Sequence, residues 1–226
     1  MKTFVCIGCS NGRHFGRVYR SLMPDWHVVN LSFGGAGNEF IAGRLCEYLT
    51  TQPKPDRVYV QFSGLNRIDI PMDPGEDDWG GYEYLTRTDW FTWLHSGGHH
   101  SSWHKNPRVS QLMERRRFIM ENNRWPLAVR SMQQVLLSLA MCDAHQVPVT
   151  WSTYYNWRRP PNEFVHLNDG AIDRWPHWLP RDRQIEPDPF TWAERQRDTP
   201  EDGVHWSAES FESWCQGPGR RSWSAD

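Results

Sequence analysis

The first 63 residues alternate between short apolar runs and segments with helical spacing, and this rhythm limits the fold more than any other feature. The apolar runs at residues 3–8, 27–32 and 57–63 are expected to be strands, and the segments 13–22 and 38–50 are expected to be helices. Strands and helices in alternation favour a parallel sheet with helices on both faces. The sequence therefore predicts an α/β protein, with a three-layer α/β/α sandwich around a central, mainly parallel sheet.

Two long stretches rich in tryptophan interrupt this alternation. Residues 68–108 are expected to form an inserted lobe or long loop with a short helix near 86–95, and residues 156–200 form a second irregular insertion. Between the two insertions, residues 108–121 and 125–145 have the spacing of helices. Several apolar residues mark the second of these helices as buried. They are Leu127, Val129, Met132, Val135, Leu136 and Leu139.

Regular elements return in the C-terminal part. Residues 147–153 suit a fourth strand, and residues 207–215 suit a final helix capped by Ser207. Asn38 is the expected N-cap of the helix at 38–50. We expect a single domain over residues 1–216, followed by a flexible tail over 217–226.

Composition argues against several classes of protein. The formal net charge of −2 gives no reason to expect binding to nucleic acid. No run of 18 apolar residues is present, so a membrane span is not expected. The N-terminal segment lacks the long apolar stretch of a signal peptide. The cysteines are odd in number, and reduced thiols in a cytoplasmic setting are the simplest interpretation. We therefore expect a cytoplasmic or virion-associated protein.

Residues 8–12 (GCSNG) are the first candidate for chemistry, because they join a predicted strand to a predicted helix. The pattern GxSxG occurs in the nucleophile turn of α/β-hydrolases, but that fold needs several strands before the serine and only one is present here. In this position Ser10 would lie at the carboxyl edge of the sheet, where helix N–H groups favour negative charge. The alternative is an ordinary glycine-rich turn.

The second candidate is the Asp202–His205 pair near the C-terminus. A hydroxyl is a weak nucleophile that needs a base, usually histidine. The histidine in turn needs a partner that fixes its tautomer, and an Asp three residues earlier in a tight turn is able to supply it. The alternative is a surface loop that leads into a helix.

Two further segments follow predicted strands. Residues 30–38 are rich in glycine, which lets a backbone N–H approach a ligand closely. Residues 63–66 end in Asn66, whose amide is able to donate a hydrogen bond to a developing oxyanion. Each segment is ordinary by itself. Together with the serine and histidine segments they would meet at one edge of a parallel sheet.

In this combination the sequence resembles the SGNH/GDSL hydrolase family. That family has a GDS block near the N-terminus, a glycine block after the second strand, a GxND block after the third strand and a DxxH block near the C-terminus. The resemblance covers residues 3–67 and 200–215. The corresponding blocks here are residues 8–10, 30–35, 64–67 and 202–205.

The resemblance implies a flavodoxin-like SGNH fold and a role for five residues. Ser10 would be the nucleophile, His205 the base and Asp202 the partner that orients the base. The oxyanion hole would consist of the backbone N–H groups of Ser10 and Gly35 and the side chain of Asn66. No cofactor and no metal are implied.

Three positions depart from the family pattern. Cys9 replaces the Asp before the serine, Arg67 replaces the Asp after the block-three Asn, and Trp206 follows the histidine where proline is common. These changes affect the hydrogen bonds that brace the serine turn, and none of them removes a triad or oxyanion group. Cys9 is an alternative nucleophile, but its side chain is expected to point away from that of Ser10.

A histidine cluster raises the question of a metal site. His95 and His99 have the i, i+4 spacing that suits zinc on a helix. Gly97 and Gly98 interrupt any helix there, and no carboxylate or cysteine lies among the histidines. An exposed loop is therefore preferred to a metal site. The full cluster is His95, His99, His100 and His104.

The tryptophans of the insertions suggest a carbohydrate substrate, because aromatic faces beside acidic groups are a common way to hold sugar rings. Most of them are expected to pack the insertions, and a few to contact substrate. The candidates for substrate contact are Trp79, Trp90, Trp93, Trp103 and Trp206.

The predicted function is a serine esterase that removes an O-acetyl or other short acyl group from a carbohydrate through an acyl-enzyme intermediate. The alternative is a catalytically degenerate binding or structural module on the same fold. Such a module would serve as a virion or surface-assembly component that binds glycan or protein. The expected protein partner is another copy of the chain, in a homo-oligomer, or a virion assembly component.

Overall fold

The protein is built on one sheet of four parallel strands in the order β2-β1-β3-β7. This confirms the predicted parallel sheet. The strands are β1 (Lys2–Ile7), β2 (Trp26–Asn30), β3 (Arg57–Phe62) and β7 (Val149–Thr153). The computed structural model describes residues 1–65, 67–73, 85–95, 107, 109–112, 114–115, 124–154, 179–196 and 206–224.

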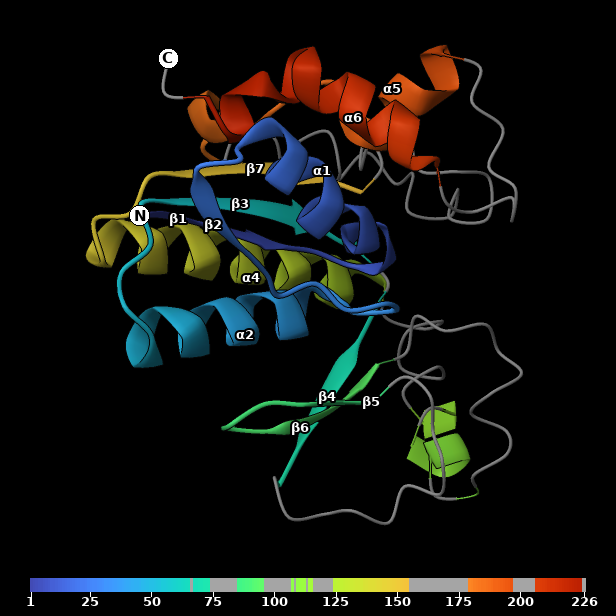
Figure 1. Ribbon diagram of the computed structural model, residues 1–226. Helices are drawn as coiled ribbons and strands as arrows, with labels where there is room; N and C mark the ends of the chain where they lie inside the picture. Colours follow the sequence, from blue (N-terminus) through green and yellow to red (C-terminus); the bar gives the residue numbers. More distant parts are fainter. Residues whose placement is uncertain are drawn as a thin grey trace.

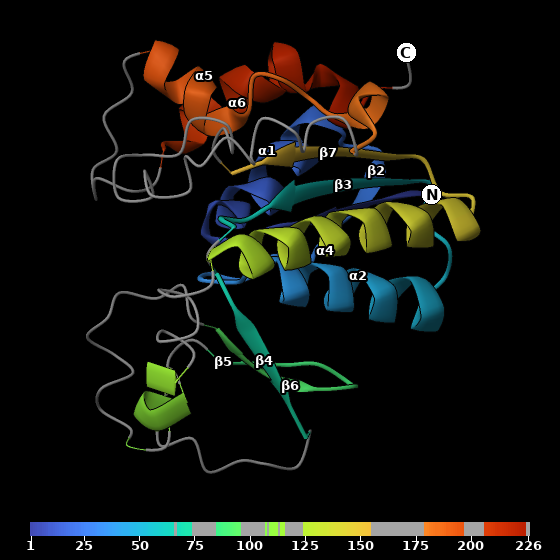
Figure 2. The ribbon, with the colours of Figure 1, turned by 180° about the vertical axis from the view of Figure 1, so that it is seen from behind.

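Helices cover both faces of this sheet, which confirms the three-layer sandwich (Figure 1). α2 (Asn38–Thr51) and α4 (Arg124–Ala144) lie on one face. α1 (Phe15–Leu22), α5 (Pro189–Arg195) and α6 (Ala208–Gln216) lie on the other, as the view from behind also shows (Figure 2). Short 3-10 helices complete this part of the chain. They are η1 (Ser10–His14), η5 (Arg181–Arg183) and η6 (Pro218–Ser222).

The core consists of two layers, because successive side chains of a strand point to opposite faces of the sheet. In β1, Val5 and Ile7 pack on the side of α2 and α4, whereas Phe4 and Cys6 pack on the side of α1 and α6. All four side chains are fully buried. A strand covered on both faces has a continuous apolar run, which is the pattern that residues 3–8 show.

The N-terminus of α2 differs from the prediction, because Gly37 rather than Asn38 is the N-cap residue. Asn38 is instead fully buried, and its Oδ1 accepts a hydrogen bond from the backbone N–H of Ser63 at 2.7 Å. Two N–H groups at the start of this helix, those of Gly37 and Phe40, donate hydrogen bonds to the carboxylate of Asp69, a residue distant in the sequence.

The described part of the first insertion is a small antiparallel sheet in the order β4-β6-β5. It consists of β4 (Asp69–Met72), β5 (Leu85–Arg87) and β6 (Thr92–His95). The prediction of a helix near 86–95 is therefore wrong. A turn between Thr88 and Phe91 reverses the chain instead, with the Thr88 N–H donating to the Phe91 carbonyl at 2.8 Å.

The segment before β7 is helical, as predicted. The described residues between 107 and 115 are helical, and α4 follows. Met132, Val135 and Leu139 of α4 are buried, but Leu136 is 39% exposed. Leu136 lies at the edge of the buried stripe, because each residue of a helix is turned by about 100° from the one before it and Val135 points into the core.

The C-terminal segment packs against the domain. Ser207 caps α6 as predicted, and its hydroxyl accepts from the Ser210 N–H at 3.0 Å. η6 follows, and the Ser222 hydroxyl is buried 2.9 Å from the Tyr19 hydroxyl. The Trp223 indole N–H donates to a carbonyl of α6 at 3.0 Å. Residues 217–224 are thus packed where the sequence predicts a flexible tail, because their polar groups find partners on α1 and α6.

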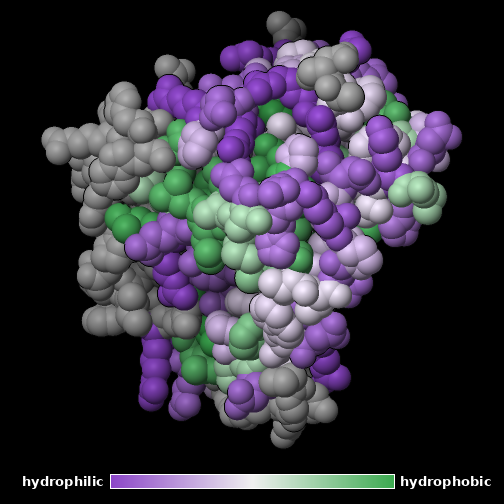
Figure 3. All heavy atoms as spheres, turned by 90° about the vertical axis from the view of Figure 1, so that its left-hand side faces the viewer, coloured by the Kyte–Doolittle hydropathy of each residue, from purple (hydrophilic) through white to green (hydrophobic). Residues whose placement is uncertain are grey.

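The surface at the amino ends of the strands is mostly hydrophilic, with smaller areas of hydrophobic residues between (Figure 3). Within the described ranges, no helix combines the length and the apolar character that a membrane crossing requires. The five cysteines are free thiols.

Candidate active site

Ser10 begins η1, three residues after the end of β1. β1 lies between β2 and β3, so Ser10 is at the carboxyl edge of the sheet where the chain connections on its two sides diverge. Open α/β sheets bind their ligands at such a point. The Ser10 Oγ is buried and accepts or donates no hydrogen bond among the described residues. A buried hydroxyl without a partner is uncommon and is available for a reacting group.

Glycines let the serine turn pack closely against the strands beside it. A Cβ at Gly12 would lie 2.1 Å from the Ser32 Cβ and 2.2 Å from its Oγ. A Cβ at Gly8 would lie 3.0 Å from the Phe15 ring and 3.1 Å from the Gln61 Cβ. The two glycines of the GCSNG motif are therefore required by close contacts with the segment after β2 and with β3.

Asn30, at the end of β2, braces the serine turn. Its Nδ2 donates to the Gly12 carbonyl at 2.8 Å, and its Oδ1 accepts from the Ser32 N–H at 3.0 Å. Sequence reasoning included Asn30 in the glycine block but missed this role. The signal available was an amide side chain at the end of a strand that neighbours the serine strand.

Cys9 is fully buried in the core cluster between the sheet and helices α2 and α4. Its carbonyl accepts from the Gly12 N–H at 2.8 Å and closes the turn. Cys9 therefore serves as a packing residue, and the brace that the family pattern leads us to expect from an Asp at this position is provided by Asn30.

The glycine block forms a tight turn next to the serine turn. The Ala36 N–H donates to the Phe33 carbonyl at 3.3 Å, and Gly35 has a φ of 82°. A positive φ at this position of a turn favours glycine. The Phe33 N–H donates to the Gly8 carbonyl at 3.2 Å, so the two blocks are joined by backbone hydrogen bonding.

The third block is tied to the glycine block through Arg67. The Arg67 Nη1 donates to the Ala36 carbonyl at 3.4 Å, and the guanidinium lies 5.8 Å from the centre of the Tyr154 ring. The Arg67 N–H also donates to the Gly64 carbonyl at 3.3 Å. Asn66, the predicted oxyanion donor, lies outside the described residues.

Asp202 and His205 also lie outside the described residues, so their predicted roles stay predictions. The next residue, Trp206, is only 1% exposed. Its ring centre lies 5.0 Å from that of Phe211, which in turn lies 5.0 Å from that of Phe15. Trp206 thus packs in the core between α1 and α6, and the prediction that it contacts substrate is corrected.

Trp93 likewise packs in the core. It is 5% exposed, its ring centre lies 5.7 Å from that of Phe40, and it fills the space above Gly43, where a Cβ would lie 2.8 Å from the indole. The prediction that Trp93 contacts substrate is therefore corrected. The ring is buried, and it packs the insertion against α2.

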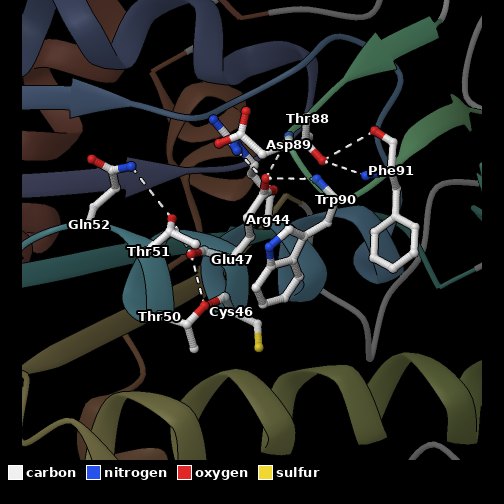
Figure 4. A network of polar contacts seen from close by, with 10 residues as sticks. All are labelled: Arg44, Cys46, Glu47, Thr50, Thr51, Gln52, Thr88, Asp89, Trp90 and Phe91. Carbon is white, nitrogen blue, oxygen red and sulfur yellow. Dashed lines mark hydrogen bonds and ion pairs between the residues drawn. The ribbon is translucent and has the colours of Figure 1, made fainter. Parts of the chain in front are cut away.

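Trp90 is 39% exposed and lies at the tip of the β5–β6 hairpin (Figure 4). Its backbone N–H donates to Glu47 in the third turn of α2, at 3.2 Å. At 1.5 Å per residue, Glu47 is about 13 Å along the helix from its N-terminus. Trp90 is therefore beside α2 and not at the edge where Ser10 lies. Trp79 and Trp103 lie outside the described residues.

His95 is a buried partner of Asp69, with the His95 Nδ1 2.8 Å from the Asp69 Oδ1. The other histidines of the sequence cluster, His99, His100 and His104, lie outside the described residues. Among the residues that are described, no group of three or more His, Cys, Asp or Glu side chains is arranged to hold a metal ion.

One further carboxyl group lies near the glycine block. Burial raises the pKa of Glu39, in the first turn of α2, to about 7, and the nearby Asp69 carboxylate adds to this. The guanidinium of Arg130 on α4, 2.8 Å from the Glu39 Oε1, acts in the opposite direction. This ion pair links α2 to α4 beside the candidate site.

Comparison with solved structures identifies the fold. The chain has the fold of the SGNH/GDSL hydrolases. A G-D-S-L family lipolytic protein from Veillonella parvula matches with a TM-score of 0.55 and 7% identity over all of both chains. TesA matches with a TM-score of 0.52 and 13% identity over 98% of this chain and 97% of its own. The esterase EstA from Pseudoalteromonas, in a structure inhibited by monoethylphosphonate, matches with a TM-score of 0.52 and 10% identity. The match covers 98% of this chain and 96% of EstA.

No family model matches the sequence, and no curated protein matches it either. At these identities, the likeness to the three solved structures concerns the fold alone.

Proposed function

We propose that this protein is a serine esterase in which Ser10 is the nucleophile. The observation that best supports this is the Ser10 hydroxyl itself. It is buried, it has no partner among the described residues, and it lies in a braced turn at the carboxyl end of the central strand β1. The glycine block is bonded directly to this turn, through the Phe33 N–H and the Gly8 carbonyl. A nucleophile beside backbone N–H donors is the arrangement that acyl transfer needs.

In the proposed reaction, the Ser10 Oγ attacks the ester carbonyl while His205 accepts the hydroxyl proton. The carbonyl oxygen becomes an oxyanion, which the N–H groups of Ser10 and Gly35 and the amide of Asn66 stabilise. His205 then gives its proton to the leaving alcohol. A water molecule then attacks the acyl-enzyme while His205 accepts a proton from it. His205 passes this proton to the Ser10 Oγ as the bond between that oxygen and the acyl carbon breaks, and the acid is released. Asp202 holds His205 in the tautomer that this sequence of steps requires.

The packing of Trp206 supports the assignment of His205. The Trp206 ring contacts Phe211, Phe211 contacts Phe15, and Phe15 lies against Gly8 of the serine turn. A continuous row of aromatic contacts thus runs from Trp206, which follows the proposed base in the sequence, to the serine turn.

The substrate that we propose is an O-acetyl or other short acyl ester of a carbohydrate. Support for the ester comes from the fold, since one structural neighbour is described as an esterase and another as a lipolytic protein. Support for the carbohydrate comes from the Trp-rich and acidic insertions of the sequence. With Trp93 and Trp206 buried in the core and Trp90 beside α2, the remaining candidates for sugar contact are Trp79 and Trp103.

A fluorophosphonate probe and p-nitrophenyl acetate test the proposal together. The wild type should be labelled and should hydrolyse the ester, and Ser10→Ala should abolish both. Ser32→Ala is the matched control, because Ser32 has another buried hydroxyl without a described partner beside the same turn. That variant should keep both activities. Release of acetate from an acetylated oligosaccharide, compared with a simple acetate ester, then tests the carbohydrate preference.

Equal ester hydrolysis by the wild type and Ser10→Ala would overturn the mechanism. A wild type that is neither labelled by the probe nor able to hydrolyse the ester at neutral pH would favour the alternative, a degenerate binding or structural module. One observation favours that alternative. Arg67 stands where the family has Asp, and its guanidinium is engaged with the glycine block and Tyr154.

A further inference from the structure

A buried acid–histidine pair lies beneath the glycine block, and the proposed reaction does not use it. Asp69 on β4 and His95 on β6 are direct partners in the antiparallel sheet of the insertion. Both side chains are fully buried, and the His95 Nδ1 is 2.8 Å from the Asp69 Oδ1. On the other side of the ring, the His95 Nε2 is 3.0 Å from the Thr86 hydroxyl on β5. Each of the three strands thus contributes one polar group.

The Asp69 carboxylate holds the end of the glycine-rich segment, residues 30–38. Its Oδ1 accepts from the Gly37 N–H at 2.8 Å, and its Oδ2 accepts from the Phe40 N–H at 2.7 Å. A negative charge at these N–H groups also suits the N-terminus of α2. A Cβ at Gly37 would lie 2.8 Å from the Asp69 Oδ2, so this approach is possible only because residue 37 is glycine.

The His95 ring holds the beginning of the same block. Its centre lies 4.9 Å from that of Phe33, the first residue of the turn that contains Gly35, and 4.8 Å from that of Phe40. The two members of the pair therefore contact the glycine block on both sides of Gly35. We call residues 33–37 the oxyanion loop.

The hydrogen bonds give His95 a defined orientation. A carboxylate only accepts, so the Nδ1 of His95 bears the hydrogen that is donated to Asp69. In the neutral ring the Nε2 then accepts from the Thr86 hydroxyl. An Asn side chain at position 95 would place an amide N–H near the Nδ1 site, whereas Leu would fill similar space without any donor.

We propose that Asp69 and His95 are positioning residues that fix the oxyanion loop, and with it the Gly35 N–H, in the geometry for transition-state stabilisation. This inference rests on the proposed function. Neither residue touches the substrate in this account. They act through Gly37, Phe33 and Phe40, because the backbone donor is rigid only if the segments on both sides of it are held.

The chain offers a matched control for the docking of the insertion. Glu47 is a second buried carboxylate between the insertion and α2, and its Oε1 accepts from the N–H groups of Asp89 and Trp90 at 2.7 and 3.2 Å (Figure 4). Its Oε2 is 2.8 Å from the Arg44 Nη1. Glu47→Gln therefore weakens the docking of the same small sheet, but far from the oxyanion loop.

The kinetic test compares His95→Leu, His95→Asn, Asp69→Asn and Glu47→Gln with the wild type on p-nitrophenyl acetate. His95→Leu and Asp69→Asn should lower kcat by about 10- to 100-fold, because a donor displaced by about 1 Å loses much of its effect. Their KM should stay within about twofold, since the oxyanion forms only in the transition state. His95→Asn should recover most of the lost kcat, and Glu47→Gln should keep the kcat of the wild type.

Amide hydrogen exchange of residues 33–40 provides a measurement that does not depend on activity and needs only folded protein. Exchange there should be faster in His95→Leu than in the wild type and in Glu47→Gln. Unchanged kcat and unchanged exchange in His95→Leu would overturn the inference, even with Ser10 established as the nucleophile. A wild type that hydrolyses no ester would overturn the proposed function. The exchange result would then still decide whether the pair holds the loop.

Discussion

Replacement of Gly12 by Ala should disturb the serine turn through a direct clash with the segment after β2. The added Cβ would lie 2.1 Å from the Ser32 Cβ, whereas non-bonded carbons make contact at about 3.5–4.0 Å. The neighbour cannot rotate away, because the clash is with its Cβ and not with the end of a flexible side chain. The turn or the segment after β2 must therefore move by about 1 Å or more.

Two quantities follow from this displacement. Overpacking of this kind costs about 1–3 kcal/mol, which in a chain of this size lowers Tm by roughly 2–4 °C for each kcal/mol. A shift of about 1 Å in the nucleophile should lower kcat by about 100-fold. Urea unfolding and p-nitrophenyl acetate hydrolysis measure the two effects in the same preparation.

A double variant separates this clash from other effects of alanine. Ser32→Gly removes the Cβ that the new methyl group at position 12 would meet. Gly12→Ala combined with Ser32→Gly should therefore regain most of the stability and the activity that Gly12→Ala loses. The coupling free energy between the two changes should be favourable and above about 0.5 kcal/mol. A Gly12→Ala protein with the stability and kcat of the wild type would refute the reasoning, and so would a double variant with no recovery.

Three further predictions concern single residues. Asn66→Ala should lower kcat by about 10²–10³-fold with little change in KM, as for the loss of one oxyanion donor, and steady-state kinetics checks this. Cys9→Ala should keep ester hydrolysis and probe labelling at Ser10, because Cys9 is a buried packing residue, whereas loss of labelling would support Cys9 as the nucleophile. Burial raises the pKa of Asp188, the cap of α5, above its ordinary value to about 6. A raised pKa in the folded state means that the fold favours the protonated Asp188 carboxyl. The stability that depends on this protonated carboxyl is present below about pH 4 and is lost as the pH rises through about 6. The free energy of unfolding of the wild type should therefore fall relative to that of Asp188→Asn by on the order of 2 kcal/mol between about pH 4 and 7, and parallel curves would count against the assignment.

The elements of the sandwich were predictable because their signals are local. Residues 3–8 form a continuous apolar run, and the structure has β1 at Lys2–Ile7. Ser207 has the chemistry of an N-cap and caps α6. The position of Ser10 between a strand and a helix also follows from neighbouring residues alone. In each case a periodicity or a cap within a few residues determines the conformation.

The errors occurred where a distant segment decides the conformation. The residues near 86–95 form the β5–β6 hairpin, and β6 also pairs with β4, an earlier segment that no pattern within residues 86–95 reveals. Asn38 has the chemistry of a cap, but the Asp69 carboxylate takes that role and Asn38 turns toward Ser63. The tail after residue 216 is ordered by a partner on α1, Tyr19, which no local pattern reveals.

The sequence by itself determined the class of the sheet, the succession along the chain of its four strands and the location of Ser10 at a strand end. These depend on short-range patterns of apolar residues, glycines and caps. The sequence did not predict α5, which lies within residues 156–200 where it predicts an irregular insertion. Only the tertiary structure decided that Asn30 braces the serine turn, that Trp93 and Trp206 are core residues, and that Asp69 and His95 meet beneath the glycine block. The physical reason is that hydrogen-bond partners and burial depend on strand register and packing between segments distant in the chain, and spacing along the sequence does not specify either.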